Sequence, residues 1–431
     1  MLVSTVVGFS IFIILLSLGF HIASVLFLLG ISGGIFSLGT AVVLDFGNQI
    51  WAALDNYVLT AVPLFILLGE IFLLSGTAER VYHALSLFLA PLPGGLLHAN
   101  IASCSVMAAC SGSSVATAAT FGTIALPIFQ GKGYEKRITL GSLAAGGTLG
   151  ILIPPSINMI IYGSIANVSV GRLFIAGIIP GILLALSFSV FIAVMSILKP
   201  LITGKEPRTI LKYKLQALPA ILPSLFIIFI VMGSIYLGWA TPTEAAALGV
   251  LAVIIVTIVK RRLTIEILNK ALLETVKTTG MLLLIIAAAY YMNYVITIMN
   301  LPKVLTVWFA TLKLSPAMTM WMLVLFYLIL GCFIEAVAMM ITTIPLIVPL
   351  AGSVGYDPLW FGIFITVLCE AALITPPLGL NLYVIQGVRP DKGPMADIAL
   401  GSLPFLCLMI FLLGVLIYFP NLALWLPNQM F

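Results

Sequence analysis

The sequence predicts an all-α polytopic membrane protein built as an inverted repeat, with two re-entrant helical hairpins and two broken transmembrane helices. The observations behind this prediction are the composition, a duplicated motif and the placement of basic residues. Of the 431 residues, 62% are hydrophobic and only 8% are charged, whereas soluble domains are about half apolar and a quarter charged. The longest polar stretch, residues 199–214, is too short to fold alone. Any ligand must therefore bind within the membrane or on partner proteins.

One motif occurs twice at a nearly constant spacing. Its landmarks are Cys110, Pro127, Gly133-Tyr134 and Pro154-Pro155 in the first copy, and Cys332, Pro349, Gly355-Tyr356 and Pro376-Pro377 in the second. Each landmark recurs after 222 residues, for example 332 minus 110 and 376 minus 154. A repeat in hydrophobic segments that Gly and Pro interrupt is typical of transporters whose binding site lies between two halves.

Simple transmembrane spans are expected outside the interrupted regions, because these stretches have about the 20 apolar residues that cross a hydrocarbon core. The first has no basic residue ahead of it and is interpreted as a retained span, not a signal peptide. The predicted spans are 2–20, 22–45, 57–76, 172–198, 216–237, 241–259, 279–300 and 397–420.

Basic residues set the predicted orientation, because cytoplasmic loops accumulate Lys and Arg. With the loop 199–214 placed inside, only Arg172, Lys303 and Lys313 of the 19 basic residues fall outside. Both termini then lie on the external side. The first interrupted region begins from the cytoplasmic side and the second from the external side, so the two copies are predicted to be inverted.

The two interrupted regions, 91–166 and 315–388, each read as a re-entrant hairpin followed by a broken helix. A Pro pair removes backbone donors and leaves carbonyls unpaired, which is tolerated only inside protein or beside a wet cavity. The interruptions should therefore converge near the midplane, where oxygen ligands suit Na⁺. The candidate ligands are Ser111, Gly112, Ser113, Ser114, Gly147, Thr148, Gly150 and Ser156, with Gly331, Glu335, Thr375, Gly379 and Asn381 in the second region.

Three carboxylates are predicted at membrane depth, where burying a charge is costly: Glu70, Glu335 and Glu370. Glu335 lies at a hairpin tip and could coordinate an ion or act as a structural helix cap. Glu70 and Glu370 could act directly, or could be protonated or bonded to freed amides. The positive ends of the helices that follow the tips favour a substrate carboxylate.

Catalysis is disfavoured, because the three histidines lie near span ends and no nucleophile and base share a recognisable spacing. The five cysteines form no CxxC pair and are expected to be small buried hydrophobes. Amphipathic segments at 77–89, 262–277 and 302–313 are predicted to be interfacial arm helices that link moving and static parts.

These predictions divide the chain into four parts. Residues 1–90 form N-terminal scaffold spans and an arm helix, and residues 91–198 form the first transport repeat. Residues 199–314 comprise the cytoplasmic loop, further scaffold spans and arm helices, and residues 315–431 form the second, inverted transport repeat.

Four stretches carry a family resemblance that extends over essentially the whole chain: SGSSVATAATFGTIALPIFQGKGY, AGGTLGILIPPSINMIIYG, GCFIEAVAMMITTIPLIVP and ITPPLGLNLYV. They resemble the large membrane subunit of tripartite ATP-independent periplasmic (TRAP) transporters. The resemblance implies an elevator-type secondary transporter of the bacterial inner membrane, driven by a Na⁺ gradient. It also implies a small four-helix membrane subunit, a soluble periplasmic binding protein and organic acid substrates such as C4-dicarboxylates or sialic acids.

The resemblance also implies roles for individual residues. One Na⁺ site would use Ser111, Gly112, Ser113, Gly147 and Gly150, and another would use Gly331, Glu335, Thr375 and Gly379. The substrate between them would contact Ser113, Ser114, Thr148, Pro154, Ser156, Asn158, Pro376 and Asn381. Glu335 stands where many relatives have Asp, which leaves its reach to an ion open. No organic cofactor or nucleic acid is expected.

The small subunit is expected to be a separate chain, since no additional helices precede the first half. No Arg or Lys is predicted at membrane depth, so helix dipoles, hydroxyls and bound cations are expected to neutralise a substrate carboxylate. The alternative is a stand-alone cation-coupled carboxylate symporter that needs no binding protein. An intramembrane enzyme using Glu335 or Glu370, and a channel, are less consistent with hairpins that enter from opposite sides.

Overall fold

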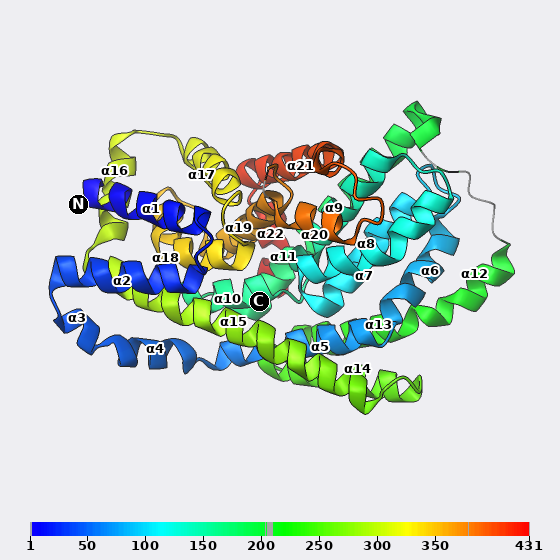
Figure 1. The fold of residues 1–431 in the computed structure, drawn as a ribbon, viewed down its shortest axis with the longest axis horizontal. Helices are drawn as coiled ribbons and strands as arrows, with labels where there is room; N and C mark the ends of the chain where they lie inside the picture. Colours follow the sequence, from blue (N-terminus) through cyan, green and yellow to red (C-terminus); the bar gives the residue numbers. More distant parts are fainter. Residues whose placement is uncertain (1, 203, 205–209, 378, 431) are drawn as a thin grey trace.

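The computed structural model describes residues 2–202, 204, 210–377 and 379–430, and within these ranges the regular structure is entirely helical (Figure 1). Six of the described helices are long and apolar enough to cross a membrane, or eight spans if each of two bent helix pairs counts as one. One bent pair is α9 (Lys136–Leu152) with α10 (Ile157–Ala166), at 43°. The predicted polytopic, all-α membrane fold is confirmed.

The helices of the interrupted regions repeat at the spacing of the motif. Helices α8 and α18 begin 222 residues apart (336 minus 114), and so do α9 and α19 (358 minus 136). The first set is α7 (Leu96–Ser111), α8 (Ser114–Gly131), α9, α10 and α11 (Val170–Leu198), and the second is α17 (Pro316–Leu330), α18 (Ala336–Ser353), α19 (Pro358–Leu373), α20 (Leu380–Val388) and α21 (Met395–Tyr418).

The duplication also includes the flanking helices, which the sequence motif does not reveal. The starts of α1 and α13, and of α2 and α14, are 220 residues apart, and those of α6 and α16 are 224 apart. These helices are α1 (Leu2–Ser17), α2 (Ile22–Leu38), α6 (Thr77–Leu89), α13 (Leu222–Tyr236), α14 (Pro242–Val259) and α16 (Leu301–Thr311). The helices from α1 to α11 therefore form one copy of the repeat, and the helices from α13 to α21 form the other.

The copies differ in the helix that precedes the arm. The first copy is interrupted, with α4 (Phe46–Leu54), the 3-10 turn η1 (Tyr57–Thr60) and α5 (Ala61–Leu74), whereas the second is the continuous α15 (Ile265–Ile298). The predicted arm at 262–277 and span at 279–300 are thus one helix. Gly280, near the start of the predicted span, has open space around it and is tolerated within the helix.

The predicted span 22–45 is also shorter in the structure. Helix α2 ends at Leu38, because Gly39 adopts φ 79°, and the short α3 (Ala41–Leu44) follows. The remaining elements are η2 (Pro200–Ile202), α12 (Leu211–Ala217), η3 (Leu218–Ala220) and α22 (Asn421–Met430).

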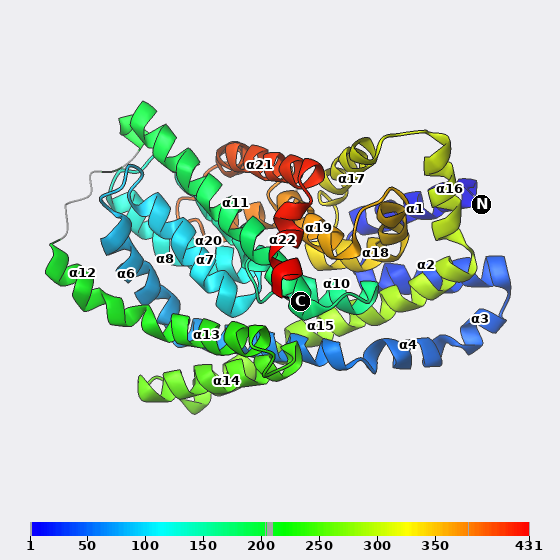
Figure 2. The same ribbon diagram turned by 180° about the vertical axis from the view of Figure 1, so that it is seen from behind.

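Two helices form the centre of the molecule. Every residue from Ile138 to Leu152 of α9 and from Leu359 to Leu373 of α19 is buried. Helix α9 packs against α7, α8 and α21, while α15 packs against α2, α4 and α5. Figures 1 and 2 show α4, α5, α14 and α15 along one long edge of the molecule, with α19, α20 and α21 farther from that edge. The helices that lead into the two Pro-Pro breaks are therefore the most enclosed.

Candidate functional site

The first hairpin tip lies against the first break. The tip, residues 112–113, joins α7 to α8, and Gly112 has the left-handed φ of 59°. A Cβ atom at Gly112 would lie 3.1 Å from the Pro155 carbonyl oxygen, and one at Gly150 would lie 2.6 Å from the Ser113 carbonyl oxygen. Glycine at both positions lets the tip backbone approach the end of α9 and the break at 153–156.

The second tip and the second break meet in the same way. A Cβ atom at Gly331 would lie 2.2 Å from the Ala372 Cβ near the end of α19. The Cys332 thiol lies 3.9 Å from the Pro376 carbonyl oxygen, within the break that follows. Both Pro-Pro bonds, Pro154-Pro155 and Pro376-Pro377, are cis. Each copy therefore pairs its own tip with its own break.

Contacts between the copies bring these two pairs together. The Ser114 hydroxyl at the start of α8 lies 2.7 Å from each carboxyl oxygen of Glu370 on α19. The Asn381 amide nitrogen at the start of α20 donates to the Ala144 carbonyl of α9 at 3.4 Å. A Cβ atom at Gly147 would lie 3.1 Å from that same nitrogen. The two helices before the breaks, the first tip and the second half-helix thus form one packed unit.

The helix N-termini at the site are capped differently in the two copies. Ser113 accepts a hydrogen bond from the Ala116 amide at 3.3 Å and caps α8. Ser156 accepts from the Met159 amide at 3.4 Å and caps α10. The corresponding positions before α18 and α20, Glu335 and Gly379, make no side-chain cap bond. The N-terminus of α20 therefore has no side-chain acceptor at its N-cap, whereas at α18 the Glu335 carboxyl group still interacts with the Val337 amide.

Two asparagines occupy the second position of the half-helices that follow the breaks. Asn158 of α10 and Asn381 of α20 are both fully buried. Neither amide atom of Asn158 has a hydrogen-bond partner among the described residues, nor has the Asn381 amide oxygen. A buried amide without a partner costs about 1–3 kcal/mol, so these groups are suited to a polar ligand.

The other predicted residues lie close to this site, but several are in regular helix. Gly147, Thr148 and Gly150 belong to α9, because the interruption spans only 153–156. The Thr148 and Thr375 hydroxyls bond carbonyls of their own helical turns, Ala145 at 2.6 Å and Ala371 at 2.8 Å. The first interruption is therefore shorter than predicted, because proline disrupts helical geometry only near its own position.

The remaining candidates fall at the edges of the unit. Ser111, the last residue of α7, lies 3.4 Å from the Thr117 hydroxyl. Pro154 lies against Gly177 of α11, and Pro376 and Glu335 are half-buried in the second break and tip. Glu70 is half-buried on α5, within electrostatic reach of Lys270 and Glu274 on α15. Glu70 therefore faces the flanking helix and not Glu370.

Among the residues that the structure describes, no group of three or more His, Cys, Asp or Glu side chains could hold a metal ion. Oxygen atoms near the tips and breaks come from hydroxyls, amides, backbone carbonyls and the carboxylates Glu335 and Glu370. Oxygen atoms of these kinds are the ligands that hard cations prefer in proteins.

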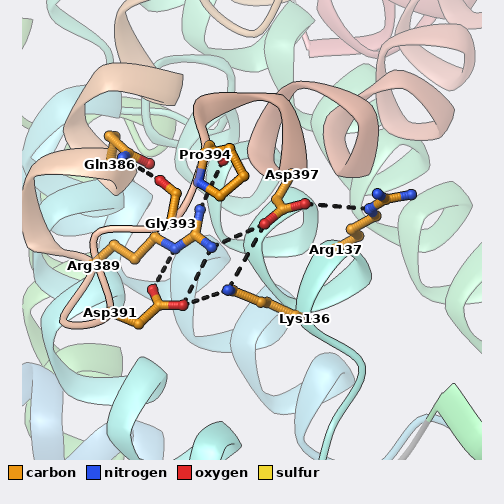
Figure 3. A network of polar contacts seen from close by, with 8 residues as sticks. All are labelled: Lys136, Arg137, Gln386, Arg389, Asp391, Gly393, Pro394 and Asp397. Carbon is orange, nitrogen blue, oxygen red and sulfur yellow. Dashed lines mark hydrogen bonds and ion pairs between the residues drawn. The ribbon is translucent and has the colours of Figure 1, made fainter.

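Two features were missed by sequence reasoning. The Ser114–Glu370 bond joins residues 256 positions apart, which no local pattern reports. A cluster of charged residues around Arg389 also joins the copies (Figure 3). Its residues contributed to the sequence argument only as cytoplasmic basic residues, although the run RPDKGPMAD alternates basic and acidic groups.

Comparison with known proteins identifies the family. The family described as "Tripartite ATP-independent periplasmic transporter, DctM component" matches residues 9–422. The chain is 36% identical over 403 residues to the C4-dicarboxylate TRAP transporter large permease protein of Pseudomonas aeruginosa, covering 93% of each chain. It is 31% identical over 382 residues to the sialic acid TRAP transporter large permease protein of Vibrio cholerae, covering 88% of each.

A solved structure is similar in fold. The crystal structure of the Alcanivorax borkumensis YdaH transporter superposes with a TM-score of 0.58 at 15% identity, covering 91% of this chain and 90% of that one. This likeness supports the all-helical transporter fold. The relatives are transporter permease subunits and not enzymes. The chain therefore belongs to the DctM family, the large membrane permease component of tripartite ATP-independent periplasmic transporters.

Proposed function

We propose that this TRAP permease subunit imports an organic acid across the bacterial inner membrane by symport with Na⁺. A periplasmic binding protein would deliver the substrate, and a separate small four-helix subunit would complete the membrane complex. The single observation that carries the proposal is the convergence of the first tip, the half-helices and Glu370 around buried amides that lack partners.

The case for Na⁺ rests on the donor atoms at the tips and breaks. Ser111 and Ser113 place hydroxyls beside the first break, and Glu335 places a carboxylate at the second tip. Backbone carbonyls at the ends of α9 and α19 add further oxygens, since the last turn of a helix leaves its carbonyls without intrahelical partners. Two unlike cation sites, one in each copy, fit this arrangement.

The case for an acidic substrate rests on the second copy. The N-terminus of α20 lacks a side-chain cap, and a substrate carboxylate is stabilised by such free amides and by the helix dipole. Asn158 and Asn381 could bond a substrate carboxylate or hydroxyl. The relatives named above transport C4-dicarboxylates and sialic acid, and we propose a substrate of this class.

The duplicated architecture supports alternating access by an elevator movement. The hairpins, the broken helices and α11 and α21 would move as one body, while α2, α5, α13, α14 and α15 would remain in the membrane as the scaffold. The proposed orientation has 199–214 in the cytoplasm, both termini in the periplasm and the two copies inverted, and the distribution of basic residues supports it.

Uptake by reconstituted protein tests the proposal. The chain, a small subunit and candidate binding proteins are incorporated or added to proteoliposomes, and accumulation of labelled organic acids is followed under an imposed Na⁺ gradient. We expect accumulation that requires Na⁺ and the binding protein. Equal accumulation under a proton gradient alone would reject Na⁺ coupling, and full accumulation without the binding protein would support the stand-alone symporter instead.

A further inference from the structure

Helix α20 carries Asn381 at its beginning and is followed directly by Arg389, the centre of the charged cluster in Figure 3. The helix has only nine residues, which is too short to be stable by itself. Its position is therefore set by its surroundings: buried Leu382 and Ile385 pack against α8 and α9, and polar contacts hold its two ends. At the first end, Asn381 contacts Ala144 and Gly147 of α9.

At the other end, the Arg389 guanidinium is almost completely enclosed, with 1% of its side chain exposed. It donates to Asp391 at 2.5 Å and 3.3 Å, to Asp397 at 3.0 Å and to the Pro394 carbonyl at 3.0 Å. These bonds fix the end of α20 to the loop and to the first turn of α21. A planar guanidinium suits this role, because it holds several acceptors in fixed directions.

The same carboxylates reach across to the first copy. Lys136, the first residue of α9, forms ion pairs with Asp391 and Asp397, and Arg137 bonds Asp397 at 3.4 Å. Helix α20 is therefore held against α9 at both ends and runs antiparallel to it. The separation from Asn381 to Arg389 is about 12 Å at the helical rise of 1.5 Å per residue.

Gly393 shows that the cluster is closely packed. A Cβ atom at this position would lie 2.1 Å from the Arg389 guanidinium nitrogen and 3.0 Å from the Lys136 ammonium. The Gly393 carbonyl in turn accepts from the Gln386 amide of α20 at 2.8 Å. The loop after α20 is thus shaped around Arg389.

Among the described residues of the first copy, no corresponding ion-pair cluster lies at the end of α10. Arg389 and Asp391 correspond, at the offset of 222, to Asn167 and Ser169. Asn167 ends α10 in the left-handed conformation with φ 54°, and Ser169 caps α11. The half-helix of the first copy is thus ended by backbone geometry and neutral caps, and only that of the second copy is anchored by charge.

We propose that Arg389, with Asp391, Asp397 and Lys136, positions helix α20 so that Asn381 and the second break hold the geometry that binds Na⁺ and substrate. This inference rests on the function proposed above. Arg389 acts through α20 and does not itself contact the transported species. Groups that position ligands in this indirect way typically change metal affinity by about 10-fold to 100-fold when they are removed.

The test compares Na⁺ half-saturation and substrate KM in the uptake assay for Arg389→Gln and Gly393→Ala. The second variant keeps every charge, so it reports on geometry alone. We expect both variants to raise the Na⁺ half-saturation concentration about tenfold. The control Lys277→Gln removes one member of the exposed Lys277–Glu274 pair on α15 and should leave it unchanged.

A merely structural role is distinguished by the double variant Arg389→Gln/Asp397→Asn, which balances the charges again. It should recover thermal stability but not Na⁺ affinity. Recovery of both, or a Na⁺ half-saturation within twofold of wild type in both Arg389→Gln and Gly393→Ala, would overturn the inference. Failure of the wild-type protein itself to show Na⁺-activated uptake would instead reject the proposed function.

Discussion

The two copies of the repeat place similar backbones around one site but complete their helices in different ways. In the first copy, Ser113 and Ser156 cap the helices that follow the tip and the break. In the second copy, Glu335 and Gly379 leave these positions without a side-chain cap, and Arg389 anchors α20 from its far end. The first copy thus uses serine caps where the second uses a charged anchor, while each copy keeps a buried asparagine with an amide atom that has no partner among the described residues.

The glycine that allows each tip to approach its break lies on different elements in the two copies. Gly150 on α9 faces the Ser113 backbone, whereas its counterpart at the 222-residue offset, Ala372 on α19, faces Gly331 of the second tip. The first contact is to backbone atoms and the second is mainly to a methyl group. Because an alanine Cβ moves only with its backbone, neither tip can take a larger residue at its glycine without a backbone shift.

The largest predicted effects are those of Gly150→Ala and Gly331→Ala. The added methyl group would lie 2.6 Å from the Ser113 carbonyl and must displace the tip, and misplacement of a binding group by about 1 Å can cost about 100-fold in rate. We expect a loss at least as large from Gly331→Ala, whose added methyl group would lie 2.2 Å from the Ala372 Cβ, an atom that cannot move without its backbone. The control Gly352→Ala adds a methyl group where nothing lies within 4 Å and should keep wild-type uptake. Uptake by Gly150→Ala or Gly331→Ala as high as that of the control would contradict the close packing of that tip.

Ser114→Ala tests the bond that joins the copies. It removes the hydroxyl that bonds the buried Glu370 carboxyl group, and we expect a loss of about 1–3 kcal/mol of stability. Thermal unfolding of the purified protein measures the loss. Ser187→Ala is the matched control, because that hydroxyl bonds only a carbonyl of its own helix. A melting temperature for Ser114→Ala as high as that of the control would contradict the structural role of this contact.

Substitution of the N-cap residues tests the difference in helix capping between the two copies. Ser156→Ala should cost about 1 kcal/mol, the usual value of a lost N-cap, and should lower the melting temperature even without Na⁺. Glu335→Ala removes only the interaction of its carboxyl group with the Val337 amide, so we expect no larger change without Na⁺ than for Ser156→Ala, but a smaller stabilisation on adding Na⁺. If Na⁺ stabilises Glu335→Ala and wild type equally, Glu335 has no part in ion binding.

The smallest predicted effect is the acid sensitivity of the charged cluster. Hydrogen bonds and charges of Arg389 and Lys136 hold the pKa of Asp391 well below its usual range. A lowered folded-state pKa gives stability that is present above the unfolded-state value of about 3.9 and is lost as pH falls below it. The melting temperatures of wild type and Asp391→Asn should therefore differ by a constant amount from pH 7 to about 4.5, and should converge in more acidic buffer. A gap that closes already between pH 7 and 5 would contradict this assignment.

The sequence predicted the parts of the fold that are local and repeated. Helices α8, α9, α18 and α19 begin at the spacing of the motif, because Gly, Pro and N-cap residues act within a few positions of themselves. The predicted arm at 77–89 coincides with α6. The single helix α15 was predicted as two elements, because its first part, 262–277, is amphipathic and its second, 279–300, is apolar.

The sequence named candidate site residues but could not indicate which of them pair. Ser114 and Glu370 were both candidates, yet their bond depends on how α8 packs beside α19. Asn158 and Asn381 are separated by 223 positions and not by 222. They are recognised as equivalent only because each is the second residue of its helix, α10 or α20. The residues of the Arg389 cluster come from α9, from α21 and from the loop between α20 and α21. The sequence of a loop does not indicate which partners its charged residues have.

The most direct test of the shared site is the Na⁺ dependence of Cys332 labelling. This thiol lies in the second tip beside Pro376 and is half-buried, whereas Cys104, Cys110 and Cys369 are buried. A Cys407→Ser background removes the exposed thiol. We predict that Na⁺, but not an equal concentration of choline, slows labelling of Cys332 by a membrane-permeable maleimide severalfold, and that substrate slows it further. Labelling at the same rate in Na⁺ and choline, in protein whose uptake requires Na⁺, would contradict the placement of ion and substrate between the tips and the breaks.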